Sequence, residues 1–202
     1  MASVGDSVDV FAASLGREAV TNLSARDATG DSSLVSAAQA GDRLAFGQLY
    51  EQYARMVHGI LMARVPPGQV DDLVQDVFLV ALRRLSALRD ISRFGAWLAA
   101  IARNRANDYH RQSMSAVEVT DDFSQAEAVS GVSDSAADSE AAVILAAIRS
   151  LPEAYREPLI LRLVEGMTGP EIAARTGLKP GSVRVNLHRG IEQLREKLAQ
   201  KL

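Results

Sequence analysis

The chain has 202 residues, with 22 Lys and Arg against 25 Asp and Glu, 48% apolar residues and no cysteine. This length allows one domain or two small ones. The absence of cysteine excludes a disulfide scaffold, a zinc finger and a thiol nucleophile, and it fits a reducing cytoplasm. No stretch approaches the ~18 consecutive apolar residues of a membrane span. The first thirty residues lack a basic segment followed by an apolar one, so no secretory signal is expected.

The formal net charge of -3 is unevenly distributed along the chain. Residues 31–112 sum to +2 and residues 141–202 to +4, whereas 1–30 sum to -2 and 113–140 to -7 without a single base. An acidic segment rich in Ser and Ala buries too little apolar surface to offset its ordering entropy. The sequence therefore predicts a disordered leader over 1–30, a helical domain over 31–112, a flexible acidic linker over 113–138 and a second helical domain over 139–202.

In the first domain, apolar residues recur at spacings of three and four, which predicts four helices. The first runs from a cap at Asp31 to Ala40, and the second from a cap at Asp42 to about Val65, where prolines stop it. The third covers about 70–87 and the fourth about 93–111. No run alternates β-branched with polar residues, so the predicted fold class is all-α.

The end of the fourth helix reads Arg103-Asn104-Arg105-Ala106-Asn107-Asp108-Tyr109-His110-Arg111. Its arginines, amides and ring supply donors for phosphates and bases and a surface for stacking. A cationic helix C-terminus that complements the helix dipole explains the same composition. Composition alone leaves both interpretations open. Trp97 is assigned to the core, because it shares the apolar stripe with Leu98 and Ile101.

The second domain contains the pattern of a helix-turn-helix. Helices near 139–149 and 153–165 come first, and Pro158 is expected to kink the second or shift its start. Thr168 and Glu171 then form a capping box, Gly177 accepts the positive φ of the turn, and Ser182 caps the second helix. The outward face of this helix is predicted to contact DNA, and it holds Arg184, Val185, Asn186, His188 and Arg189. A helical hairpin used only for packing is the alternative.

Catalytic and metal-binding patterns are missing from the sequence. His58, His110 and His188 lie far apart without metal-ligand spacing, and there is no glycine-rich phosphate-binding loop. No cofactor and no metal are expected, and the chain is not expected to be an enzyme.

Three motifs, taken together, resemble those of bacterial RNA polymerase sigma factors of the sigma-70 family, of the extracytoplasmic-function (group 4) type. Asp71 to Phe78 (DDLVQDVF) resembles region 2.2, Phe94 to Asn104 (FGAWLAAIARN) resembles regions 2.3 and 2.4, and Leu151 to Arg189 resembles region 4. The motifs follow one another in the family's order and spacing. The resemblance implies a region 2-like four-helix domain and a region 4-like helix-turn-helix domain, joined by the flexible acidic linker.

The resemblance also implies partners. The protein would bind core RNA polymerase through the β′ coiled coil and the β flap, recognise promoter DNA, and respond to stress under the control of an anti-sigma factor; no membrane partner is implied. Asp72, Gln75 and Asp76 would face the β′ coiled coil, although acids in a first helical turn also favour the helix dipole.

On the DNA side, the resemblance implies two sets of contacts. The −10 element would meet Arg93, Arg103, Asn104, Arg105, Asp108 and Arg111. The −35 element would meet Ser182, Arg184, Val185, Asn186, His188 and Arg189. Two departures from the family pattern are Val185-Asn186, where Ser-Arg is common, and Asp108, where an amide or a base is usual. Asp108 either accepts from a cytosine amine or pairs with Arg105 or Arg111.

Two alternatives stay open from the sequence. The acidic linker either stands in for nucleic-acid phosphates in the polymerase channel or is a solvated tether. The protein as a whole is either a sigma factor or a stand-alone helix-turn-helix regulator with 31–112 as an effector or dimerisation domain. The second would bind duplex DNA tightly without polymerase.

Overall fold

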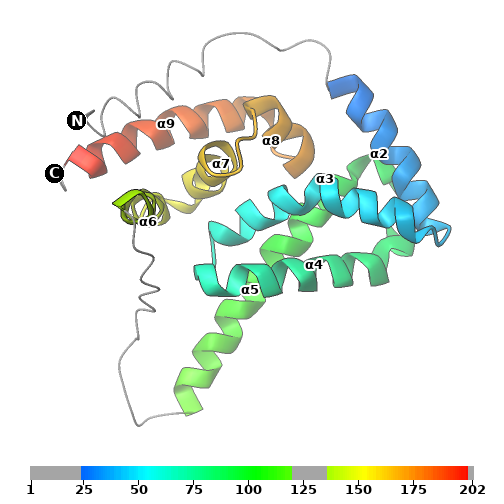
Figure 1. Cartoon of the computed structure of the whole chain (residues 1–202), viewed down its shortest axis with the longest axis horizontal. Coiled ribbons are helices and arrows are strands. Elements are labelled where there is room, and N and C mark those ends of the chain that lie inside the picture. The colour runs from blue at the N-terminus through cyan, green and yellow to red at the C-terminus, as the bar shows by residue number, and fades with distance from the viewer. Residues whose placement is uncertain (1–23, 120–135, 200–202) are drawn as a thin grey trace.

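The computed structural model describes residues 24–119 and 136–199, and the side chains of 31–113 and 141–199 within them. All regular structure in these ranges is helical, which confirms the all-α prediction. An N-terminal unit contains α2 (Ser24–Gln39), α3 (Arg43–Met62), α4 (Val70–Arg84) and α5 (Phe94–Val119). A C-terminal unit contains α6 (Ala136–Arg149), α7 (Glu153–Leu163), α8 (Gly169–Thr176) and α9 (Pro180–Ala199) (Figure 1).

Helix α3 lies at the centre of the N-terminal unit, where α2, α4 and α5 all pack against it. Leu49, Met56 and Ile60 on α3 are fully buried, and Phe94 from the start of α5 enters the same core. The helix begins as predicted at Asp42, whose carboxylate accepts from the backbone N–H groups of the second and third helical residues. This cap satisfies donors that an α-helix leaves unpaired at its start.

Two 3-10 turns connect α4 to α5, at Leu85–Ala87 and Ile91–Arg93. Asp90 holds the second turn, since its carboxylate accepts from the backbone N–H of Ser92 at 3.1 Å. The third predicted helix therefore ends at Arg84, and its last three residues form the first of these turns.

The structure corrects the predicted boundaries at the outer ends of this unit. Helix α2 begins at Ser24, so Asp31 is not its cap; its carboxylate instead accepts a hydrogen bond from the Tyr53 hydroxyl at 2.6 Å. The predicted start relied on the preference of Asp for the N-cap position, but the helix continues through Gly30 and begins further upstream. The predicted leader is thus wrong for 24–30, and residues 1–23 lie outside the described part.

Helix α5 also continues further than predicted, to Val119, so that the first residues of the predicted linker are helical. The segment after Arg111 contains no Gly or Pro before this point, and its acidic composition does not by itself stop a helix. At the other end of the linker, α6 already begins at Ala136. The rest of the predicted linker, 120–135, lies outside the described residues.

In the C-terminal unit, α9 packs against α6, α7 and α8. Its core includes the fully buried Ile148, Leu151, Leu159 and Ile160. Helix α7 starts at Glu153 and runs through Pro158 to Leu163. The alternative of a shifted start is therefore wrong, and the proline is accommodated inside the helix.

The two units pack directly against each other, with α3 against α7 and both α2 and α5 against α8 (Figure 1). The sequence suggested two domains joined only by a tether, because nothing local in it reports contacts between distant helices. Across the described ranges, none of the helices is long and apolar enough to span a membrane.

Candidate nucleic-acid interface

Helix α8 is fixed at both ends by the residues that the sequence singled out. The Thr168 hydroxyl accepts from the Glu171 N–H at 3.3 Å, and the Glu171 carboxylate accepts from the Thr168 N–H at 2.7 Å, which confirms the capping box. Burial alone would raise the pKa of Glu171, but the hydrogen bonds from Thr168, aided by Arg175 and Arg55, hold that pKa below its ordinary value. At the other end, Gly177 has φ +73° and closes the helix as predicted.

Helix α9 presents its first half to solvent. Ser182, Arg184, Val185, His188 and Arg189 are exposed, while Asn186 is half-buried. Ser182 is not the cap of this helix, which begins two residues earlier at Pro180. Proline suits the first helical turn because its φ is already helical and it has no N–H to leave unpaired. Ser182 therefore lies in the first turn of α9, beside the other predicted contacts.

The opposite side of α9 is buried and holds the helix on the rest of its unit. Val183, Leu187, Leu194 and Leu198 are buried there and form an apolar stripe at helical spacing. The stripe continues through Gly190, which the sequence analysis missed: a Cβ there would lie 2.9 Å from a methyl of Leu159. A glycine at helical spacing within an apolar stripe is a signal for such close packing.

On α5, the predicted set falls into two groups. Asn104 and Arg111 are exposed on one face of the helix and Asp108 between them is half-buried, because residues three and four apart share a face. Arg93, in the turn before α5, is also exposed, and its Nε lies 3.3 Å from the Asp90 carboxylate. Asp108 pairs with Arg111, which is one of the two partners that the sequence offered.

Arg103 and Arg105 form the second group and are engaged within the protein. The guanidinium of Arg103 donates from Nη2 to Glu157 Oε1 at 2.6 Å and from Nε to Oε2 at 3.1 Å. Arg105 Nη2 lies 3.7 Å from the Asp76 carboxylate, across the contact between α5 and α4. These two arginines were predicted to meet DNA, yet each has a carboxylate partner in this conformation.

Helix α4 carries a second candidate contact surface. Asp72 and Gln75 are exposed, whereas Asp76 is half-buried beside Arg105. Leu79 and Leu82 lie further along the same helix, and each is 49% exposed. Because residues three apart share a helix face, the two leucines extend the exposed face that holds Asp72 and Gln75. Sequence reasoning named the acids and the amide of this helix but not these leucines.

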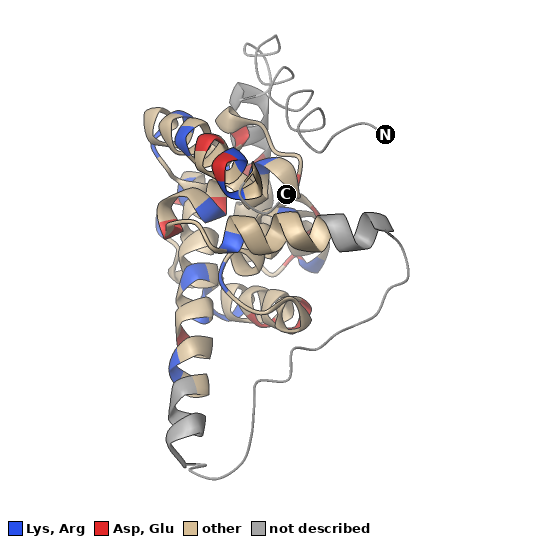
Figure 2. Ribbon diagram, turned by 90° about the vertical axis from the view of Figure 1, so that its left-hand side faces the viewer, with Lys and Arg blue, Asp and Glu red and all other residues tan. Residues whose placement is uncertain are grey.

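The charged residues are distributed differently on the two candidate DNA-binding helices, α5 and α9. Figure 2 shows basic residues at several turns of the long helix α5. On α9, basic and acidic residues alternate only in the second half. His188 on α9 lies 3.5 Å from the Glu192 carboxylate one turn later. The basic character of α9 is therefore concentrated in its first half, at Arg184 and Arg189.

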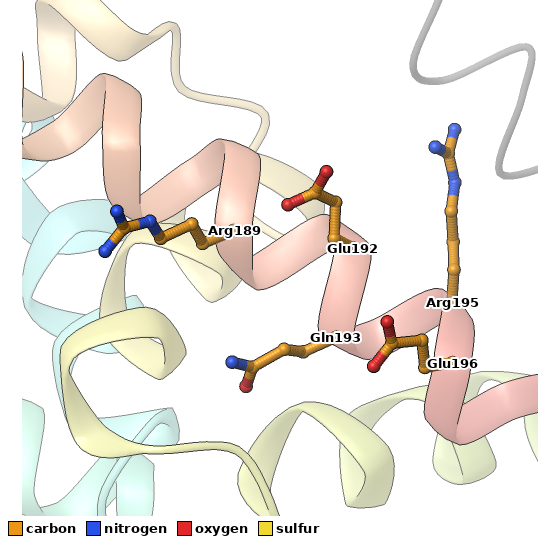
Figure 3. A pocket seen from close by; sticks show the side chains of 5 residues that line it. All are labelled: Arg189, Glu192, Gln193, Arg195 and Glu196. Atoms are coloured by element: carbon orange, nitrogen blue, oxygen red, sulfur yellow. The ribbon is translucent and has the colours of Figure 1, made fainter.

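An open hollow of about 560 Å³ lies along the second half of α9. It is lined by Arg189, Glu192, Gln193, Arg195 and Glu196, which all project from this one helix (Figure 3). Ligand sites bring polar groups together from several elements, and this hollow does not. Within the described ranges, there is also no group of three His, Cys, Asp or Glu that would hold a metal ion.

Comparison with protein families matches both units. Residues 49–115 match the family described as Sigma-70 region 2, and residues 141–194 match the family described as Sigma-70, region 4. The first match covers α4 and most of α3 and α5, and the second covers α7, α8 and most of α6 and α9.

Curated relatives point the same way. The chain is 32% identical over 179 residues to the ECF RNA polymerase sigma-E factor of Escherichia coli, covering 83% of this chain and 94% of the relative. It is 35% identical over 166 residues to the ECF RNA polymerase sigma factor BldN of Streptomyces coelicolor, covering 80% of this chain. The matched part spans 63% of the length of BldN.

A solved structure of CnrH in complex with the cytosolic domain of CnrY is similar to this fold, with a TM-score of 0.61 and 28% identity. The similarity covers 86% of this chain and 99% of CnrH. The fold and the exposed helix-turn-helix define an all-helical DNA-binding protein. With these matches, the chain belongs to the extracytoplasmic-function group of the sigma-70 family of RNA polymerase sigma factors.

Proposed function

We propose that this protein binds core RNA polymerase and directs it to promoters by recognising a −35 and a −10 element. The observation that supports this most strongly is the position of the exposed side chains. The solvent-facing residues of α9 and α5 lie on the helices that match sigma region 4 and sigma region 2. The two units are thus assigned to the two promoter elements, with the C-terminal unit on the −35 element.

The −35 contact is made by the first half of α9. A helix-turn-helix inserts this helix into the major groove with its N-terminal residues toward the base edges. Arg184 then reaches guanine edges, and Val185, which is exposed, lies against a thymine methyl. Ser182, Asn186, His188 and Arg189 complete the contact with bases and phosphates.

The −10 contact is made by α5 and the turn before it. Asn104 and Arg111 are available on the exposed face, with Arg93 beside them. Because Asp108 pairs with Arg111, its charge is partly neutralised near the phosphates. Arg103 and Arg105 contribute only after they leave their carboxylate partners. A base taken out of the stack in the opening strand needs hydrogen-bond partners of this kind.

Polymerase binding is assigned to the exposed face of α4 for the β′ coiled coil, and to the C-terminal unit for the β flap. Asp72 and Gln75 supply polar contacts on α4, and Leu79 and Leu82 add apolar area beside them. Asp76, which is half-buried beside Arg105, adds a carboxylate at the edge of the same face. The chemistry of transcription belongs to the polymerase, so this protein works in the cytoplasm without a catalytic centre of its own.

Control by an anti-sigma factor is part of the proposal. CnrH, which shares this fold, has been solved in complex with the cytosolic domain of a second protein. We infer that a regulator of this chain would bind it and keep it from polymerase.

Transcription with purified core polymerase on a genomic promoter library tests the proposal. We expect start sites that depend on the added protein and share sequences centred near −35 and −10. Free protein should bind the same promoter fragments weakly in a gel shift. Tight duplex binding without polymerase, together with no protein-dependent start sites, would identify a stand-alone helix-turn-helix regulator instead.

A further inference from the structure

Two buried carboxylates join the two units. Glu157 and Glu165 are the charged residues that are buried among 31–113 and 141–199, with 4% and 7% exposure. Both belong to the C-terminal unit, and their cationic partners all belong to the N-terminal unit. A buried charge is costly unless it is paired and hydrogen-bonded. These two carboxylates are therefore satisfied by the contact between the units, and separating the units removes their partners.

Glu157 is held by two arginines of the N-terminal unit, Arg103 on α5 and Arg64 in the turn just after α3. Arg103 on α5 donates to both of its carboxylate oxygens, at 2.6 and 3.1 Å, and Arg64 donates to Oε2 at 3.0 Å. The side chain of Arg64 is 15% exposed, so this pair is shielded from water on both sides. Arg64 also binds Glu153 at the start of α7, which extends the network to the surface.

Glu165, just after α7, is held by α3. His58 Nδ1 lies 2.7 Å from Glu165 Oε1, and Arg55 Nε lies 3.7 Å from Oε2. The guanidinium of Arg55 also donates to the backbone carbonyl of Glu165. Glu165 is therefore held through both its side chain and its main chain, which fixes the segment just after α7.

Close backbone contacts accompany the ion pairs. A Cβ on Gly59 of α3 would lie 2.7 Å from a methyl of Leu161 on α7. A Cβ on Gly95 of α5 would lie 2.5 Å from the Arg175 carbonyl oxygen on α8. The Arg175 guanidinium, in turn, donates to the carbonyl of Gln52 at 2.5 Å and lies 5.5 Å from the centre of the Tyr53 ring. The surfaces of the two units thus fit each other as the inside of a single domain does.

This arrangement is incompatible with reading a promoter. A −35 and a −10 element are centred about 25 base pairs apart, which is roughly 85 Å along B-DNA at 3.4 Å per base pair. In the structure α8, which supports the −35 helix, is in contact with α5, which carries the −10 residues. The guanidinium of Arg103 also donates to the Glu157 carboxylate, so these donors are not available to a phosphate.

We propose that the structure is an autoinhibited closed state, in which Glu157 and Glu165 form a latch between the units and Glu157 occupies Arg103 in place of DNA. The proposal rests on the function proposed above. Core polymerase binds the open state, so its apparent affinity is reduced by the fraction of protein that is open. Opening frees Arg103 for nucleic acid and lets the two units separate to the spacing of the promoter.

Two kinds of variant open the latch by different routes. Glu157→Gln removes the buried charge that pairs with Arg64 and Arg103. Gly59→Leu places a side chain where Leu161 now lies, without changing any charge, and leucine is a better helix former than glycine in α3. The matched control is Glu196→Gln, which removes the same charge from an exposed position of α9 outside the interface.

Closure is measured on the full chain by energy transfer between two dyes. The chain has no cysteine, so Gln48→Cys on α3 and Ala154→Cys on α7, both exposed, give unique labelling sites. Binding is measured with core RNA polymerase by fluorescence anisotropy. We expect both latch variants to lower the transfer efficiency and to bind polymerase at least about tenfold more tightly, while Glu196→Gln matches the wild type.

Four outcomes would overturn the proposal. In the first, the wild-type protein transfers energy as weakly as the latch variants, which means that it is already open. In the second, the latch variants keep the wild-type transfer efficiency, whatever their affinity. In the third, the latch variants open without binding polymerase more tightly, while the wild type binds it well; the proposed function then stands and autoinhibition does not. If the variants open and neither they nor the wild type bind core polymerase, the proposed function fails, and autoinhibition of it fails as well.

Discussion

Arg103 and Arg184 are both candidates for DNA contact, but their surroundings differ. Arg184 is exposed on α9, whereas Arg103 donates to both oxygens of the buried Glu157. Arginine forks bind carboxylates and phosphates with the same geometry. The residue type therefore predicts what Arg103 is able to bind, and the fold decides which anion it meets in the closed state.

Replacing Arg184 with alanine tests its assignment as a base reader. If Arg184 makes a bidentate contact with a guanine, its loss costs about 1–3 kcal/mol of discrimination at that position of the −35 element. The measurement is a reporter series over single-base −35 variants. The preferred base at one position should lose its advantage, while the ranking at other positions is kept.

The control for this substitution is Arg195→Ala, which removes the same charge from an exposed position in the second half of α9. It should weaken expression little and equally across the series. A ranking of −35 variants that is unchanged by Arg184→Ala would contradict the assignment of Arg184 as a base reader.

At the scale of single elements, sequence reasoning succeeded where local chemistry decides the structure. The Asp42 cap, the capping box of α8 and the positive φ of Gly177 were all predicted from residue types at fixed spacing. It failed at Ser182, because a serine and a proline near the start of α9 both suit a helix start, and Pro180 comes first. Boundaries without such a signal, as at Val119, were also missed.

The capping box of α8 gives a prediction about stability. Thr168→Ala removes the hydroxyl that accepts from the Glu171 N–H, and it should lower the free energy of unfolding by about 1 kcal/mol. Urea unfolding monitored by circular dichroism measures this change. Thr168→Ser keeps the hydroxyl and should stay close to the wild type. Equal losses in the two variants would mean that the methyl group, not the cap, supports α8.

At the scale of the whole molecule, the arrangement of the two units could not be predicted from the sequence. Glu157 and Arg103 are 54 residues apart, and no periodicity relates them. Counting charges by segment identified two basic domains, but it could not show that acids of one domain neutralise bases of the other. That pairing depends on tertiary contacts, and it is the part of the candidate site that the sequence could not predict.

Closure of the molecule should depend on pH through His58. The hydrogen bond with the Glu165 carboxylate raises the pKa of His58 above its ordinary value of 6.5, against the opposing effect of burial, with Asp71 adding to the rise. Glu165 lies across the interface, Asp71 is on α4 and Arg55 shares the Glu165 carboxylate from α3. When the units separate, His58 loses Glu165 and with it the main cause of the raised pKa.

The closed state therefore binds the His58 proton more tightly than the open state. The stabilisation of the closed state by protonated His58 is fully present below about pH 6.5, and it is lost as the pH rises through the raised pKa of His58. Energy transfer between dyes at positions 48 and 154, measured across this range, should fall with rising pH. His58→Gln keeps a polar side chain that does not titrate, so its profile should be flatter, whereas His188→Gln, on the exposed face of α9, should follow the wild type. A His58→Gln profile as steep as that of the wild type would assign the pH dependence to another group.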